Sequence, residues 1–288
     1  ANEIEGVKLV FKKGKNTIVL KLQKKEEKTW WKLLDQSSGG GGDDDDDAAG
    51  MGGMGGMHGK GPPTPVVCKD VLPKVQLDFG PVLLNKGFQR IPTADALRGK
   101  TSLALYFGGS WCPHCPPFIE ILKPFHCELK ALDATFECIY ISGDRSEQEA
   151  NRYYSASMGD WLMMPFSAER CRALMSAIGL QGIPTVVFCT SDGTILTKSG
   201  RDIVSSCSPK TVVEERLLER LEKGAQVKSS LYGSANEATR SISSTVTVEG
   251  FDDNADPVVS VGGSRVAVRR HFLQPAAPKP CADAFPPA

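Results

Sequence analysis

The chain has 288 residues, of which 41% are hydrophobic and 24% charged, as in ordinary globular domains. Its 34 basic and 34 acidic side chains cancel, which argues against a nucleic-acid partner bound through bulk positive charge. No apolar run approaches the roughly 20 residues that span a bilayer, so we also expect no membrane partner.

Residues 1–36 have the composition of β-strands. Val7–Phe11 and Thr17–Leu22 are rich in β-branched and apolar residues, with a glycine-centred turn between them. The second run, followed by Trp30 and Trp31, resembles the closing strands of a CS domain, the β-sandwich of co-chaperones for a heat-shock ATPase. This resemblance implies a partial CS-like segment with a heat-shock chaperone as its partner. Two strands cannot bury both faces of a sandwich, so we expect the segment to be unstable alone.

Residues 37–66 are of low complexity. A glycine run leads into Asp43–Asp47 and then into a Met-Gly-Gly repeat, a pattern similar to the tails of those co-chaperones. Such a composition buries too little apolar surface to offset the entropy lost on ordering. We therefore predict a disordered linker, acidic and rich in Gly and Met.

Residues 67–225 carry the signal of a folded domain. Strands are predicted at 81–85, 102–108, 135–142, 184–190 and 194–198. Helices are predicted at 113–132, 145–158, 168–178 and 209–223. This alternation predicts an α/β fold, a central mixed sheet flanked by helices, with an antiparallel hairpin near its end.

Residues 226–288 are rich in Ser, Gly, Ala and Pro. The stretch 258–268 has the pattern of a β-hairpin, but an isolated hairpin is marginal in water. We therefore predict a mostly disordered tail.

The nine cysteines are Cys68, Cys112, Cys115, Cys127, Cys138, Cys171, Cys189, Cys207 and Cys281. An odd number scattered through apolar stretches is not typical of a secreted disulfide framework. We expect most of them to be reduced core thiols, and the chain to be cytoplasmic, with the nucleus as a further location.

The strand predicted at 102–108 runs through a Gly-Ser turn into Trp111-Cys112-Pro113-His114-Cys115. Cysteines three residues apart at a helix start lie on one side and can close a disulfide. We expect Cys112 at the helix N-terminus, where the dipole favours a thiolate, and Pro113 in the first turn, which tolerates proline. Cys112 would attack a substrate disulfide, and Cys115 would resolve the mixed disulfide.

His114 is expected to tune this pair. When protonated, it places a positive charge beside the Cys112 thiolate, which makes the disulfide a stronger oxidant. A lone Cys-x-x-Cys also fits half of a zinc site in a binding scaffold, but Cys127 and Cys138 do not supply a second pair at the usual spacing. We therefore favour redox chemistry and expect neither a metal nor a bound cofactor.

Several stretches along residues 83–204 resemble tryparedoxin and nucleoredoxin, members of the thioredoxin superfamily. They are Gly99–Phe107, the Trp-Cys-Pro-His-Cys motif, Ile141–Ser146, Trp161–Leu162 with Met164–Phe166, and Gly182–Thr185. The resemblance implies a thioredoxin-like fold with an inserted helical segment. It also implies a thiol–disulfide oxidoreductase, with peroxiredoxin-type protein disulfides as plausible substrates.

The same resemblance gives roles to residues around the two cysteines. It implies that Pro184 is cis and faces Cys112, and that the backbone of Ile183 pairs with a bound substrate strand. It places Trp111 beside the nucleophile, and Tyr106 where many thioredoxins carry a buried Asp that aids proton transfer. For both aromatic residues, a plain core role is the alternative.

The chain departs from the usual pattern of these families at three points. His114 stands in place of a second Pro between the cysteines. Pro116 and Pro117 follow the second cysteine where Arg is usual, and Glu120 replaces a helix Pro. These changes bear on the redox potential and on the partner surface, and they leave the dithiol in place.

Two functions of different class follow from these observations. The first is an enzyme that passes electrons between a low-molecular-weight dithiol or a reductase and protein disulfides. The second is a co-chaperone or adaptor, in which the CS-like segment docks on a chaperone and the thioredoxin-like domain binds clients. A pure binding module has no need of the intact Cys112 and Cys115 pair, so we favour the enzyme.

Overall fold

The computed structural model describes residues 4–12, 17–24, 68–229, 242 and 245–276, in two units, Ala1–Gly61 and Pro62–Ala288. In the first unit, β1 (Ile4–Lys12) and β2 (Thr17–Lys24) pair antiparallel, with Val7 opposite Leu22. The two strands expected in this segment are therefore present. Trp30, Trp31 and the predicted linker lie outside the described residues.

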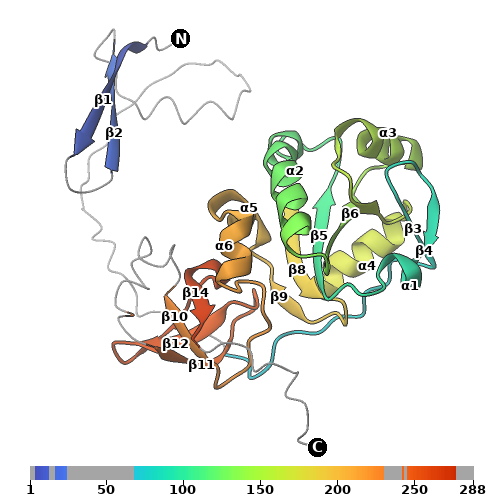
Figure 1. The fold of residues 1–288 in the computed structure, drawn as a ribbon. Helices are drawn as coiled ribbons and strands as arrows, with labels where there is room; N and C mark the ends of the chain where they lie inside the picture. The colour runs from blue at the N-terminus through green and yellow to red at the C-terminus, as the bar shows by residue number, and fades with distance from the viewer. Residues whose placement is uncertain (1–3, 13–16, 25–67, 230–241, 243–244, 277–288) are drawn as a thin grey trace, which may run out of the picture. The chain divides into compact units, whose positions relative to one another are not determined.

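Seven strands in the order β4-β3-β7-β6-β5-β8-β9 form the main sheet of the second unit (Figure 1). They are β3 (Val82–Leu84), β4 (Arg90–Pro92), β5 (Ser102–Gly108), β6 (Phe136–Ser142), β7 (Leu162–Met163), β8 (Thr185–Thr190) and β9 (Ile195–Thr197). β5 runs parallel to β6 and antiparallel to β8. All five predicted strands are present, whereas β4 and β7, with three and two residues, are too short for a sequence pattern to reveal.

The helices are α1 (Thr93–Ala96), α2 (Cys115–Leu132), α3 (Glu147–Ser157), α4 (Ala168–Ile178), α5 (Gly200–Ser206) and α6 (Pro209–Glu214). On one face of the sheet, α3 stacks Tyr154 on Tyr140 of β6. On the same face, Arg201 of α5 lies over the Phe118 ring of α2. α4 packs on β6 from the other face (Figure 1).

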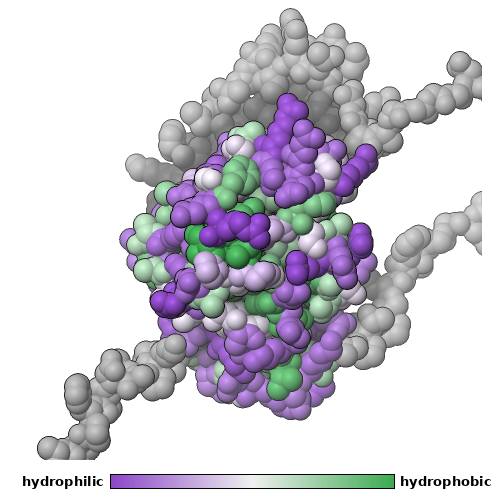
Figure 2. All heavy atoms as spheres, turned by 90° about the vertical axis from the view of Figure 1, so that its right-hand side faces the viewer, coloured by the Kyte–Doolittle hydropathy of each residue, from purple (hydrophilic) through white to green (hydrophobic). Residues whose placement is uncertain are grey.

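β5 and β6 lie at the centre of the core. All seven residues of β6 are buried, and so are six of the seven in β5, because helices cover both faces. The face shown in Figure 2 is mostly hydrophilic, with hydrophobic residues in small separate patches, as expected around an enclosed core. Within the described residues, no helix is long and apolar enough to cross a membrane.

Two predicted helices have different bounds in the structure. α2 begins at Cys115, so Pro113 precedes the helix instead of lying in its first turn. Pro116 and Pro117 lack the N–H groups that would bond the carbonyls of residues 112 and 113. The helix therefore cannot start at residue 112 or 113 and begins at Cys115. The helix predicted at 209–223 ends at Glu214, because Arg216 adopts a left-handed conformation with φ of 56°.

The prediction of a mostly disordered tail is wrong for the described part of residues 226–288. That part forms a five-stranded antiparallel sheet in the order β13-β12-β11-β10-β14. Its elements are β10 (Gln226–Ser229), β11 (Val246–Phe251), β12 (Pro257–Val261), β13 (Ser264–Ala267), β14 (Leu273–Pro275) and the short 3-10 helix η3 (Arg270–Phe272). The predicted hairpin is its β12–β13 pair. Phe251 also pairs with Lys69, and this long-range support is invisible to a local pattern.

Candidate active site

The main sheet brings three separate segments to one edge. Because β5 and β6 are parallel, the residues that follow them leave the sheet side by side. Because β8 is antiparallel to β5, the residues before β8 arrive at the same edge. The Cys112 and Cys115 turn therefore meets residues 143–144 and Ile183–Pro184.

Cys112 and Cys115 occupy two successive tight turns. The backbone N–H of Cys112 donates to the carbonyl of Gly109, and that of Cys115 to the carbonyl of Cys112, both at 3.2 Å. Both residues are free thiols, and Cys112 keeps 4% of its surface exposed whereas Cys115 has 0%. This asymmetry suits attack by the outer sulfur and resolution by the inner one.

The inner thiol is adjusted by its surroundings. Burial raises the pKa of Cys115 to about 11, although the neighbouring Gly109 backbone and Tyr106 hydroxyl lower it in part. Tyr106 is fully buried in β5, and its hydroxyl has no hydrogen-bond partner among the described residues. Its ring also packs against Phe118 and Tyr140. Tyr106 is thus a core aromatic residue whose hydroxyl lowers the pKa of Cys115.

The peptide bond between Ile183 and Pro184 is cis, as the family resemblance implies. The Cys112 thiol donates to the Ile183 carbonyl oxygen, with 3.6 Å between sulfur and oxygen. Pro184 is buried and Ile183 is half-buried. The loop before β8 therefore faces the outer cysteine, as expected.

Pro113 and His114 are both exposed at the surface of the turn. His114 is the N-cap residue of α2, and its side chain makes no capping hydrogen bond. No hydrogen bond joins its ring to the Cys112 sulfur, so His114 can act on that thiol only through its charge.

Trp111 lies at the surface, with 54% of its area exposed, so it is not a core residue. Its indole N–H donates to the carbonyl oxygen of Gly143 at 2.8 Å. The N–H of Gly143 in turn donates to the carbonyl of Gly108 at 2.7 Å. The loop after β6 thereby holds the turn that carries Trp111 and Cys112.

Asp144 is a site residue whose role the sequence analysis missed, although it lies in a stretch that carries the resemblance. Its carboxylate accepts hydrogen bonds from the N–H and hydroxyl of Ser110 at 2.6 and 2.7 Å. It also accepts from the hydroxyls of Tyr140 at 3.2 Å and Ser142 at 2.7 Å. The available signal was the polar run Ser142-Gly143-Asp144, directly after the apolar stretch Cys138–Ile141.

A groove of about 240 Å³ opens beside Trp111 and Ile183. α4 contributes Cys171, Arg172 and Met175 to its wall. The groove is next to the outer cysteine and can receive a side chain of a bound peptide. Among the described residues, no three His, Cys, Asp or Glu side chains group as metal ligands.

Comparisons with known proteins agree with this geometry. Residues 99–195 match the family model described as Thioredoxin-like. A nucleoredoxin from Danio rerio is 32% identical over 130 residues, which are 45% of this chain and 30% of that protein. The chain thus spans less than a third of that relative. The main sheet and its helices form a thioredoxin-like fold.

Solved structures of similar proteins include a thioredoxin and a tryparedoxin. A thioredoxin from Wuchereria bancrofti is 35% identical, with 50% of this chain and 98% of that chain covered, at a TM-score of 0.43. Tryparedoxin II from C. fasciculata is 30% identical, with 44% and 86% covered, at a TM-score of 0.40.

Proposed function

We propose that the thioredoxin-like domain is a thiol–disulfide oxidoreductase that exchanges its Cys112–Cys115 dithiol with protein disulfides. The observation that carries the proposal is the unequal exposure of the pair, 4% for Cys112 and 0% for Cys115. The contact of Cys112 with the Ile183 carbonyl at 3.6 Å supports it, because a substrate strand bound there would lie against the outer sulfur. The match to the thioredoxin-like family model supports the same chemistry.

The proposed reaction has two exchange steps. The Cys112 thiolate attacks one sulfur of the substrate disulfide, so that a mixed disulfide forms and the other substrate sulfur leaves as a thiolate. Cys115 then loses its proton and attacks the Cys112 sulfur, which closes the intramolecular disulfide and releases the second substrate thiolate. Two electrons and two protons pass in total from the dithiol to the substrate, and no bound cofactor is required.

The partners we propose follow from this chemistry. Peroxiredoxin-type disulfides are the substrate class, and the groove beside Trp111 would take a side chain that flanks the substrate cysteine. A low-molecular-weight dithiol or a reductase would return the two electrons. A reducing compartment, the cytoplasm or the nucleus, suits a chain with an odd and scattered set of cysteines. The adaptor alternative depends on the N-terminal segment, and nothing in the β1–β2 pair favours it.

Insulin reduction by the full-length chain, with dithiothreitol as the electron source, tests the proposal. We expect turnover by the wild type, and its loss in Cys112→Ser. Cys115→Ser should form a mixed disulfide and then stall. Cys127→Ser is the matched control, because Cys127 is an exposed cysteine on α2, the helix that begins at Cys115. Wild-type turnover no faster than dithiothreitol alone would refute the enzyme.

A further inference from the structure

We propose that Asp144 is a positioning residue of this centre. Its buried carboxylate fixes the turn that carries Trp111 and Cys112, and its charge holds the Cys112–Cys115 pair towards the reducing side. The inference rests on the proposed oxidoreductase function, which it extends to a residue that touches neither sulfur.

The first part of the argument is how the carboxylate is bound. Asp144 is only 5% exposed, and both of its oxygens accept two hydrogen bonds. All the donors are neutral groups, from Ser110, Tyr140 and Ser142. Among the described residues, no cation pairs with this carboxylate. The bonds therefore satisfy its oxygens without cancelling its negative charge.

The second part is what those bonds hold in place. Ser110 is two residues before Cys112 and adjoins Trp111, and both its N–H and its hydroxyl point to the same Asp144 oxygen. Gly143, the neighbour of Asp144, binds Gly108 through its N–H and the Trp111 indole through its carbonyl. The loop after β5 and the loop after β6 are thus joined at Ser110 and on both sides of it. Without Asp144, Ser110 loses its hydrogen bonds to the loop after β6.

The third part is the charge. A buried anion near a thiol disfavours the thiolate, and a less stable thiolate makes the disulfide the preferred state. Asp144 binds the N–H and the hydroxyl of Ser110, two residues before Cys112, so its charge lies beside the turn that carries the thiol. Burial is the main cause that raises the pKa of Tyr153, and Cys115, Asp144 and Cys112 raise it further. The carboxylate and both sulfurs therefore act on one buried hydroxyl.

The other groups that face this pocket do not replace Asp144. Tyr106 from β5 and Tyr140 from β6 are neutral at physiological pH, because burial raises the pKa of both well above 10. His114 at the start of α2 carries the opposite charge when protonated. Arg145 follows Asp144 directly, but its side chain is exposed to solvent. Asp144 is thus the buried anion of the centre.

The test compares Asp144→Asn and Asp144→Ala in the full-length chain. Asp133→Asn is the matched control, since Asp133 also accepts two hydrogen bonds, from Thr135, in the loop at the opposite end of β6. The readout is the pH dependence of iodoacetamide alkylation of Cys112, followed by peptide mass spectrometry. The exposed Cys127 is the internal reference.

We expect Asp144→Asn to move the midpoint of Cys112 alkylation down by about half to one pH unit, with Cys127 unchanged. At a pH above both alkylation midpoints, equilibration with glutathione should then shift towards the dithiol by about three- to tenfold, the same change expressed as a ratio. In Asp144→Ala, the ¹⁹F resonance of 5-fluorotryptophan at Trp111, assigned with Trp111→Phe, should also move.

An unshifted alkylation midpoint in Asp144→Asn overturns the inference, and so does an equal shift in Asp133→Asn. Asp144→Asn keeps the size of the side chain, so it remains informative if Asp144→Ala does not fold. The proposed function fails in a different way. A wild-type chain that forms no Cys112–Cys115 disulfide refutes the function, whereas a normal disulfide with an unshifted midpoint refutes the role of Asp144 alone.

Discussion

The sulfur of Cys112 lies 3.6 Å from the carbonyl oxygen of Ile183, a residue 71 positions further along the chain. The Cys112 thiol donates its proton to this carbonyl oxygen. In the mixed disulfide of the proposed reaction, Cys112 has no thiol proton to donate. The proposed function then leaves this oxygen to accept a hydrogen bond from the backbone of the substrate.

The resolving step should depend strongly on pH. Burial raises the pKa of Cys115 to about 11, so its thiolate is the minor form at neutral pH. Below that value, each unit of pH should raise the thiolate fraction, and with it the rate of resolution, about tenfold. Rapid-quench measurement of mixed-disulfide decay checks this. A rate independent of pH between about 6 and 9 would contradict the assignment of Cys115 as the buried resolving thiol.

Tyr106→Phe should slow the same step. The hydroxyl lowers the pKa of Cys115 and has no hydrogen-bond partner among the described residues, so it is available to donate to the thiolate once that forms. Its removal should lengthen the life of the mixed disulfide by about tenfold, the effect of one hydrogen bond to a charged group. Because the ring remains, urea unfolding should change by less than about 1 kcal/mol. An unchanged lifetime would show that Tyr106 only fills the core.

His114→Pro should make Cys112 less reactive. The histidine is the N-cap residue of α2, makes no capping hydrogen bond and is exposed, so it can act on the thiolate only through the charge it carries when protonated. The variant should alkylate about two- to tenfold more slowly at neutral pH and should be more reducing against glutathione. Equal alkylation rates in the two proteins would remove this role from His114.

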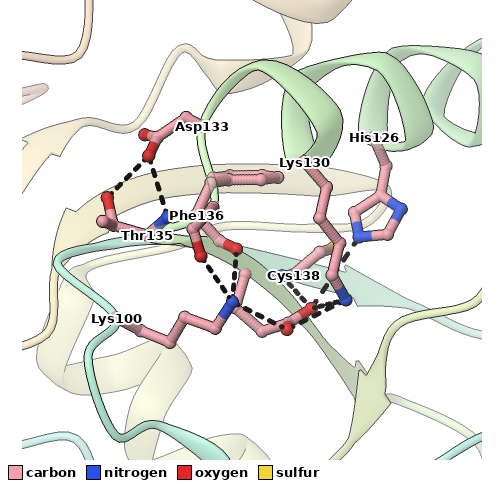
Figure 3. A network of polar contacts seen from close by, with 9 residues as sticks. Lys100, His126, Lys130, Asp133, Thr135, Phe136 and Cys138 are labelled. Carbon is pink, nitrogen blue, oxygen red and sulfur yellow. Dashed lines mark hydrogen bonds and ion pairs between the residues drawn. The ribbon is translucent and has the colours of Figure 1, made fainter.

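Glu137 should stabilise the fold from the end of the sheet opposite to the cysteines. It is buried, and Lys130 and Lys100 pair with it at 3.0 and 3.6 Å (Figure 3). Burial alone would raise the pKa of Glu137, but His126 with its Nε2 at 3.8 Å, the hydrogen bond from Lys130 and the charge of Lys130 lower it to about 2. A depressed carboxyl pKa contributes stability above 4.5 that is lost as the pH falls towards 2.

Glu137→Gln should therefore destabilise the chain by about 3 kcal/mol at neutral pH, because the stability linked to the depressed pKa of Glu137 is lost. Urea unfolding at neutral and acidic pH measures the effect, which should fade as the pH falls. Glu120→Gln on α2 is the matched control, since Glu120 pairs with Lys123 at the surface and should matter by less than about 1 kcal/mol. Equal losses in the two variants would refute the assignment.

Asp256 should have the opposite pH dependence. It is buried before β12, and burial, reinforced by the charge of Asp252, raises the pKa of Asp256 to about 7. Folding therefore favours the protonated carboxyl, and stability should fall as the pH rises from 3.8 to about 7 and then level off. Asp256→Asn should remove this slope and gain about 1–2 kcal/mol above neutral pH. If Asp256→Asn keeps the same fall of stability with pH, another titratable group causes that fall.

The elements that carry the cysteine site could be predicted from the sequence, because their local sequence patterns agree with the structure that they adopt. The apolar runs of β5 and β6, the helix after Cys115 and the turn before β8 each have a pattern readable within about ten residues. The cysteine pair followed from a motif of adjacent residues, and the cis peptide at Pro184 was implied by the resemblance to tryparedoxin and nucleoredoxin. These features need no knowledge of distant contacts.

The rest depends on contacts that are remote in sequence. Asp144 acquires its role only because parallel strands place it beside Ser110, 34 residues away. The start of α2 shifts because Pro116 and Pro117 cannot donate the helical hydrogen bonds to the carbonyls of residues 112 and 113. The C-terminal sheet is built from short strands whose composition favours disorder, and it is held in part by the pairing of Phe251 with Lys69. A short stretch of sequence does not contain both partners of these contacts.

The central claim is that Cys112 and Cys115 form one reversible disulfide. Its most direct test is equilibration of the full-length chain in glutathione buffers of graded potential, followed by acid quench, alkylation and peptide mass spectrometry. We predict that the alkylation of Cys112 and Cys115 is lost together along a two-electron titration curve and recovers on reduction. The alkylation of Cys127 should not change with them. Two cysteines that alkylate independently, or that stay reduced in the most oxidising buffer, would contradict the account.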